Sequence, residues 1–312
     1  MPYCVLTMRP LLAMAFLSPI ACWAAECRNC HPRQVSAWSQ SAHAHSLKPA
    51  LNSRFFQALP GGPIGEAPGG FLLQFTPSQN GLEVKAVRGS DNAMGLISWV
   101  FGAGRRAETP LATKGDDAIE LRISYYSAPA KFDLTLGHHP GKSGSATRAL
   151  GLLQTPDSVT RCFGCHSTGG PPGSTRFQSG VGCVACHAGA DDHAIAGTSV
   201  LNPARQGAKV LMGVCGNCHR QQPEGDPEDS INVRYQFVRL KRSRCFASGK
   251  LTCITCHDPH NDAKSDPAWY RERCLECHPD QSMKEDCLAC HMPRVALNSR
   301  LIFTDHWIRK RL

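Results

Sequence analysis

A short pattern, two cysteines separated by two residues and followed at once by a histidine, recurs seven times in this chain of 312 residues. The copies, numbered motif 1 to motif 7, occupy residues 27–31, 162–166, 183–187, 215–219, 253–257, 274–278 and 287–291. The cysteine and histidine frequencies of the chain predict about 0.04 copies by chance, so the repetition reflects a binding requirement. Of the seventeen cysteines, only Cys4, Cys22 and Cys245 lie outside the motifs.

This spacing is that of covalent haem attachment, in which two thiols bond the porphyrin vinyl groups and the adjacent imidazole ligates the iron. A thioredoxin-like redox pair needs no histidine, and zinc would leave out a histidine next to a ligating cysteine. A disulfide framework would not repeat one spacing seven times. The sequence therefore predicts seven covalently attached groups of haem c.

The predicted attachment and ligand residues follow directly from the motifs. The attaching thiols are those of Cys27, Cys30, Cys162, Cys165, Cys183, Cys186, Cys215, Cys218, Cys253, Cys256, Cys274, Cys277, Cys287 and Cys290. The proximal iron ligands are His31, His166, His187, His219, His257, His278 and His291.

The density of motifs constrains the fold. Motifs 2 to 7 leave about 22 residues for each haem, too few to enclose six macrocycles in side chains alone. Glycine (28) and proline (22) are abundant, which favours short helices and many loops. We expect a mainly α fold with much irregular structure, wrapped around covalently bound haems that contact one another.

The chain divides unevenly. We expect a signal peptide at 1–25, a first haem segment at 26–67, an insertion that contains β-structure at 68–159, and a six-haem C-terminal region at 160–312. Asn80-Gly81 between two apolar runs predicts a hairpin. Ile119, Leu121, Ile123 and Tyr125 alternate as in one half-buried strand. The insertion is therefore expected to be a small antiparallel sheet.

The first 25 residues have the features of an export signal, with Arg9, the apolar run LLAMAFLSPIA and small residues at Ala24 and Ala25. The apolar run is too short to span a bilayer. We expect a periplasmic or extracellular protein. Lipoprotein anchoring at Cys22 is the less favoured alternative, because Pro19 stands where such signals prefer leucine.

Seven histidines remain as candidates for the other side of the irons. His193 and His260 closely follow motifs 3 and 5, and His306 lies in an apolar stretch. Either of His43 and His45 could fold back over the haem held by His31. His138 and His139 are adjacent, so we expect at most one of them, His139 for example, to act as a ligand; GHHPGK is also typical of a turn. The candidate distal ligands are therefore His43, His45, His139, His193, His260 and His306.

The formal charge of +9 does not indicate a nucleic-acid partner, because two propionates on each of seven haems offset it. We expect redox proteins as partners, either quinol-linked enzymes or other cytochromes. Peripheral membrane association and the oligomeric state are left open.

The chain resembles multihaem c-type cytochromes related to the tetrahaem electron-transfer cytochrome of ammonia oxidisers. The likeness rests on ECRNCHPRQVSAWSQSAHAHS, VGCVACHAGADDH, SRCFASGKLTCITCHDPH and CLACHMP followed by FTDHWIRK. The resemblance implies a largely helical haem-wrapped fold, export, and electron transfer through stacked haems. It also implies that His43 or His45, His193, His260 and His306 are distal ligands.

These observations favour an electron carrier with a chain of seven haems. One alternative is an oxidoreductase that acts on nitrite or hydroxylamine at one iron with an open site. Another is a subunit of a haem filament.

Overall fold

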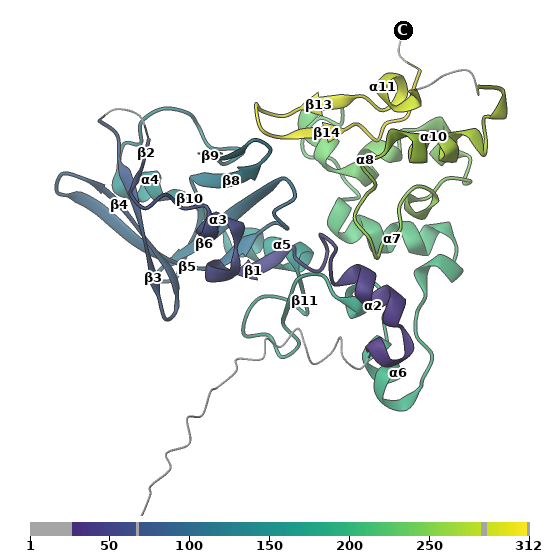
Figure 1. Ribbon diagram of the computed structural model, residues 1–312, viewed down its shortest axis with the longest axis horizontal. Helices are drawn as coiled ribbons and strands as arrows, with labels where there is room; N and C mark the ends of the chain where they lie inside the picture. Colours follow the sequence, from purple (N-terminus) through teal and green to yellow (C-terminus); the bar gives the residue numbers. More distant parts are fainter. Residues whose placement is uncertain (1–26, 67–68, 282–285, 311–312) are drawn as a thin grey trace, which may run out of the picture.

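The computed structural model describes residues 27–66, 69–281 and 286–310. The expected signal peptide and Cys22 lie outside these residues. A sheet occupies one half of the molecule and short helices the other, with α5 (Pro156–His166) between them (Figure 1). No helix in the described part of the chain is long and apolar enough to cross a bilayer.

The sheet is antiparallel and has ten strands, in the order β10-β7-β6-β5-β4-β3-β2, with β1 paired to β5 and β8 paired to β6 and β9. Its strands are β1 (Leu47–Pro49), β2 (Ile64–Gly65), β3 (Leu72–Ser78), β4 (Gly81–Arg88), β5 (Asp91–Phe101), β6 (Ala107–Lys114), β7 (Asp117–Leu121), β8 (Ile123–Ser127), β9 (Ala130–Leu134) and β10 (Gly151–Gln154).

The expectation of a mainly α protein with a small sheet was wrong, because the structure is about 33% helix and 25% strand. The sheet has a hydrophobic core of its own, in which Phe55, Phe71, Leu82, Ile97 and Leu150 are fully buried. These side chains bury apolar surface without help from a cofactor. The haem motifs give no information on this core, so the sequence predicted a smaller sheet than the one observed.

The predicted hairpin around Asn80-Gly81 is confirmed, since β3 and β4 pair, but Ser78 lies opposite Gly81, so its two turn residues are Gln79 and Asn80 and Gly81 begins β4. The single strand predicted across 119–125 was wrong. It breaks at Arg122 into β7, where Ile119 and Leu121 are buried, and β8, where the buried positions shift by one residue. Arg122 bonds Glu66 and the carbonyls of residues 139 and 141, so a loop contact interrupts the strand.

Short helices pack against the sheet or follow it. These are the 3₁₀ turn η1 (Ala50–Asn52), α3 (Arg54–Gln57) and α4 (Ala146–Leu150). Glu108 on β6 is fully buried, where it pairs with Lys48 and accepts a 2.7 Å hydrogen bond from the N–H of Phe55. This contact fixes the segment that follows motif 1 against the sheet.

The helical half contains α2 (Pro32–Trp38), α6 (Ala190–Ala196), α7 (Ala208–His219), α8 (Gln236–Leu240), α9 (Arg244–Ala247), α10 (Pro267–Leu275) and α11 (Cys287–His291). Between them lie the 3₁₀ turns η2 (Cys183–Ala185), η3 (Pro203–Arg205), η4 (Ser230–Arg234), η5 (Cys253–Thr255) and η6 (Pro279–Gln281), and the hairpins β11 (Ser167–Thr168) with β12 (Gln178–Ser179) and β13 (Arg294–Ala296) with β14 (Ile302–Thr304).

The hydrophobic core of this half is small. Its main cluster of described side chains is Met212, Phe237 and Leu240. Six of the seven motifs, all except motif 2, lie in this half or at its edge (Figure 1). Packing between its own side chains is therefore a minor source of its order, in contrast to the sheet.

Candidate functional site

Each motif forms one helical turn. In motifs 1, 3, 5 and 6 the histidine N–H donates to the carbonyl of the first cysteine, with N···O between 2.8 and 3.0 Å. Motifs 2 and 4 end α5 and α7, and motif 7 is α11 itself. One helical turn gathers two thiols and one imidazole on the same side of the backbone, the arrangement needed for attachment to one planar ring.

Eight histidines form four ring pairs, and each pair combines a motif histidine with one from outside the motifs. The ring centres are 6.4 Å apart in His31 and His193, and 6.2 Å apart in His219 and His43, in His187 and His260, and in His257 and His306. The pairs come from distant parts of the sequence, so the tertiary fold brings them together.

This separation fits a metal between two imidazoles. A metal–imidazole bond is about 2.0–2.1 Å long and the ring centre lies roughly 1.1 Å beyond the nitrogen, so two rings on opposite sides of one metal have centres about 6.3 Å apart. No group of three or more metal-binding side chains is found in the described residues. Two imidazoles beside a pair of thiols are the set of side chains that would hold a covalently attached haem.

Hydrogen bonds orient six of these eight rings through Nδ1, which leaves Nε2 for a metal. The acceptors for His43, His187, His193 and His306 are the carbonyls of Pro259, Leu201, Thr198 and Thr304, at 2.6–3.2 Å. His219 bonds the side-chain oxygen of Gln236 at 3.0 Å, and His260 bonds the carboxylate of Asp258 at 3.2 Å. Burial lowers the pKa of His306 to about 4, so this ring is neutral, as a metal ligand must be.

Three other candidate histidines have different surroundings. His45 is exposed and uses Nε2 to bond the carbonyl of Ser39 at 2.9 Å. His138 is buried, and its Nε2 lies 3.3 Å from Glu120. His139 is exposed, and its own backbone carbonyl accepts a hydrogen bond from Arg122 at 2.9 Å. The structure brings none of the three opposite a motif histidine in the described residues.

Motifs 2, 6 and 7 contain the histidines that have no second imidazole opposite them in the described part of the chain. His166 bonds the carbonyl of Ser46 through Nδ1 at 2.9 Å, and its ring centre is 5.3 Å from that of Phe101. His291 bonds the carbonyl of Arg309 at 3.0 Å, and His278 is exposed. These three motifs therefore differ from motifs 1, 3, 4 and 5.

Contacts between thiols show which motifs are neighbours. Thiols of different motifs lie close enough to affect one another's pKa: Cys27 with Cys183, Cys165 with Cys218, Cys215 with Cys253, and Cys274 with Cys287. The bond from Cys218 lowers the pKa of the Cys165 thiol to about 7. Electrostatic interactions also couple Cys186 to Cys215 and Cys256 to Cys274.

Together these contacts place the motifs in the order 1, 3, 4, 5, 6, 7, with motif 2 attached at motif 4. We call this arrangement the motif row. It departs from sequence order because α5, which carries motif 2, lies beside the sheet, and Phe163 on α5 packs against Leu47 and Leu111. Motif 2 is therefore a branch of the row.

The segment 257–262 touches three of the four histidine pairs. It contains His257 and His260, and the carbonyl of Pro259 accepts the bond from His43. The carboxylate of Asp262 accepts the N–H of Ala42 at 2.6 Å and also bonds Arg105. One short loop thus positions ligands beside motifs 3, 4 and 5.

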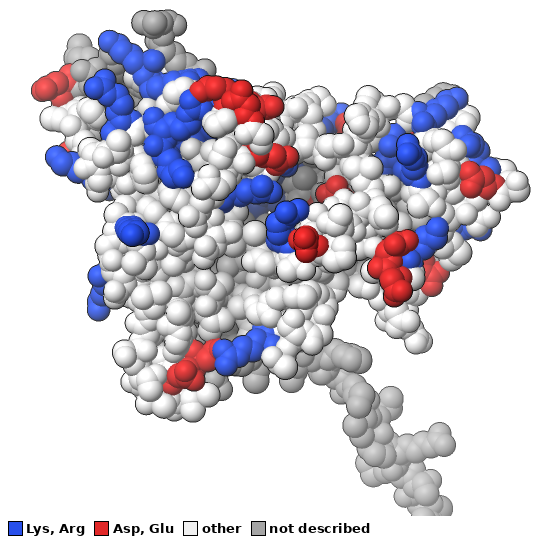
Figure 2. Space-filling model, turned by 180° about the vertical axis from the view of Figure 1, so that it is seen from behind, with Lys and Arg blue, Asp and Glu red and all other residues white. Residues whose placement is uncertain are grey.

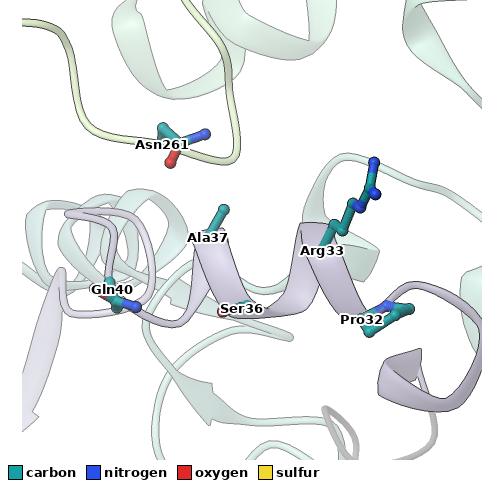
Figure 3. Close-up of a pocket in the computed structure, with 6 residues that line it drawn as sticks. All are labelled: Pro32, Arg33, Ser36, Ala37, Gln40 and Asn261. Carbon is teal, nitrogen blue, oxygen red and sulfur yellow. The ribbon is translucent and has the colours of Figure 1, made fainter.

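A cavity of about 480 Å³ lies between α2 and this loop. Figure 3 shows Pro32, Arg33, Ser36 and Ala37 along α2 and Asn261 across from them. The volume is in the range of small-molecule and cofactor pockets. Because α2 follows motif 1 and Asn261 follows His260, the cavity lies beside two of the candidate ligand segments.

The charged surface is patchy. On the face seen in Figure 2, Lys and Arg gather over the C-terminal part of the helical half, next to acidic side chains, and large areas below are uncharged.

Sequence reasoning missed the residues that orient the imidazoles. Most acceptors are backbone carbonyls, which no side-chain pattern reveals. Gln236 lies on α8, which contains no motif, seventeen residues after His219. Only the three-dimensional arrangement relates such a residue to a ligand.

Residues 26–57 and 137–188 match the model of the family described as cytochrome c554 and c-prime. No curated protein matches the chain. The fold is similar to that of the outer cell wall cytochrome OcwA, with a TM-score of 0.53 and 16% sequence identity over 91% of this chain and 78% of that chain. The stretches that match the family model contain the whole of motifs 1, 2 and 3. This match supports a multihaem c-type cytochrome.

Proposed function

We propose that the chain binds seven haems c and passes electrons between redox partner proteins along the motif row. The observation that carries the proposal is the set of four histidine pairs, each at the separation of two imidazoles on one iron. Haem supplies reversible one-electron oxidation and reduction. The match to the cytochrome c554 and c-prime family model supports the same role.

The protein's part is to hold the iron ligands still while the charge on the iron changes. Thioether attachment fixes each ring to a helical turn, and the second imidazole is held by a fold contact distant in sequence. The hydrogen bonds at Nδ1 restrict the rotation of six of the eight paired imidazoles. Two imidazole ligands favour a lower potential than a histidine–methionine pair. These features suit electron transfer with little rearrangement.

The motif row supports one route for the electrons. Motif 5 lies between motif 4 and motif 6 through the contacts of Cys253 and Cys256, whereas motif 2 is a side branch. Electrons that enter at motif 7 should therefore need motif 5 to reach motif 1. They should not need motif 2.

The test compares two variants, Cys253→Ala with Cys256→Ala and Cys162→Ala with Cys165→Ala, each of which removes one haem. The chain is attached to an electrode through an added C-terminal cysteine, and electrons taken up per chain are counted with and without a soluble mediator. With mediator, both variants should accept six electrons. Without it, the motif 5 variant should accept only the electrons that motifs 6 and 7 hold, whereas equal uptake by both variants would rule out the proposed route.

An oxidoreductase acting on nitrite or hydroxylamine is the second candidate. One observation favours it: His166, His278 and His291 face no second imidazole in the described residues, and small-molecule chemistry requires an open coordination position. Burial raises the pKa of the Cys162 thiol and the charge of Glu120 raises it further, so motif 2 has an acid–base group nearby. Turnover of either substrate with a reduced dye, at a rate above that of free haem, would support this candidate.

Export is part of the proposal, because haem c is attached outside the bacterial cytoplasm and residues 1–25 have the composition of a signal peptide. A periplasmic or extracellular location follows. Detection of the mature protein with its N-terminus near Glu26 in the secreted or periplasmic fraction would support it, and an uncleaved cytoplasmic protein would contradict it.

A further inference from the structure

A buried ion pair lies beside the histidine that is opposite motif 5. Arg239 on α8 donates from Nε and Nη2 to the two carboxylate oxygens of Asp305, at 2.9 and 2.8 Å. The two side chains are 5% and 1% exposed. A two-point contact of this kind fixes distance and angle together, which a lysine cannot do. Asp305 directly precedes His306 in the chain.

The backbone around His306 is held by further hydrogen bonds. Asp305 accepts the N–H of Trp307 at 3.0 Å. Ser243, three residues after the end of α8, accepts the N–H of Ile308 at 2.8 Å and donates to the carbonyl of His306 at 3.3 Å. The segment that carries His306 is therefore tied at several points to α8 and the turn that follows it.

Three guanidinium groups surround the ring of Trp307. Their central carbons lie 3.4 Å (Arg309), 3.8 Å (Arg242) and 5.2 Å (Arg239) from the ring centre. Arg242 also pairs with Glu228 nearer the surface. Trp307 therefore packs against the same end of α8, and Arg242 provides a contact to this ring that does not involve Asp305.

The helix α8 also holds the proximal ligand of the neighbouring motif, since Gln236 accepts from Nδ1 of His219 at 3.0 Å. We infer that α8, which has no haem motif, is a brace for the axial ligands of motifs 4 and 5, and that Arg239 is a positioning residue for His306. The inference rests on the proposed function, because it requires His306 to be an iron ligand.

A purely structural role for the ion pair predicts a different result from a positioning role. If Arg239 only stabilises the fold, its loss lowers stability and leaves the ligand set unchanged. If it positions His306, its loss also opens the iron of motif 5. Carbon monoxide binds only a ferrous haem that has an open or easily displaced sixth ligand, so its stoichiometry reports ligation independently of stability.

The experiment measures carbon monoxide bound per reduced chain, with the ferric high-spin signal as a second readout. His306→Ala is measured first and should bind one more carbon monoxide than the wild type; no increase would contradict ligation by His306 and hence the proposed function. Arg239→Lys keeps the charge but loses the two-point contact, and it should give the same extra site on part or all of the chains. Arg242→Lys is the matched control and should give none.

The inference is overturned if His306→Ala opens a site and Arg239→Lys, with its full number of haems, does not. Where Arg239→Lys does not accumulate, Ser243→Ala decides the question, because it removes the bonds to Ile308 and His306 from the same turn. It should raise the rate of carbon monoxide binding at motif 5 at least several-fold, and an unchanged rate would overturn the inference. Gln236→Leu should change the ligation of the motif 4 iron, through His219, and leave that of the motif 5 iron unchanged.

Discussion

The two histidines His43 and His45 offer the sharpest test of the ligand pairs, because the sequence does not distinguish them and the structure does. The ring centre of His43 is 6.2 Å from that of His219, and its Nδ1 bonds Pro259. His45 is exposed and uses Nε2 for a backbone bond. We predict that His43→Ala removes the sixth ligand of one iron and that His45→Ala removes none.

The expected magnitude follows from the count of motifs. One iron of seven changes from low to high spin, about 14% of the total haem signal, and carbon monoxide binding rises by one per chain. The lost hydrogen bond to Pro259 adds a stability cost of about 0.5–1.5 kcal/mol. His45→Ala, a surface change, should alter stability by less than about 0.5 kcal/mol.

The assay is a carbon monoxide titration of the reduced protein, followed at the Soret band, with electron paramagnetic resonance of the oxidised protein as a check on spin state. Both variants are compared with the wild type at equal haem content. An extra site in His45→Ala and none in His43→Ala would refute the assignment of His43 to motif 4. Extra sites in both would mean that the pairing seen here does not decide ligation.

Three further predictions concern the scaffold. Gly180 has φ +83°, and a Cβ there would lie 2.2 Å from the carbonyl oxygen of Ala44, so Gly180→Ala should displace the neighbouring His43 and produce its carbon monoxide site. Leu150 is fully buried, and Leu150→Ala should cost about 2–5 kcal/mol in chemical unfolding while the number of haems stays constant. Burial alone would raise the pKa of Glu66, but hydrogen bonds from Ser143 and Phe71 and the charge of Arg122 lower it overall. The stability that ionised Glu66 contributes is complete above its unfolded pKa and is lost as the pH falls through the lower folded value. Glu66→Gln should therefore destabilise the protein at pH 7 and reduce the loss of stability below about pH 4.5. An unchanged haem spectrum would contradict the prediction for Gly180→Ala, and an unchanged free energy of unfolding the one for Leu150→Ala. An unchanged dependence of stability on pH in the acid range would contradict the one for Glu66→Gln.

The motifs themselves could be recognised from sequence because their chemistry is local: two thiols and an imidazole within one turn. The sheet hairpin around Asn80-Gly81 could be predicted for the same reason, because its turn signal is local, although the turn residues are Gln79 and Asn80. The extent of the sheet could not. Strands β1 and β10 are short and far apart in sequence, and each joins through pairing that only the folded chain creates.

The histidine pairs show the same limit. His193, His260 and His306 were candidates by position, but nothing local indicates that the motif opposite His260 is motif 3, whose histidine is His187. The choice depends on the loop 257–262 and on Asp262, which bonds Arg105 from the segment that follows β5. Long-range contacts of this kind have no sequence period, so the row of motifs could be described only from the structure.

The central claim is that all seven motifs attach haem covalently. Intact-mass measurement of the mature polypeptide, with its N-terminus determined in the same sample, tests this claim most directly. We predict a mass excess over the bare chain equal to seven haems, retained after denaturation. A mature chain without that excess, or with an excess that matches bound zinc, would contradict the account.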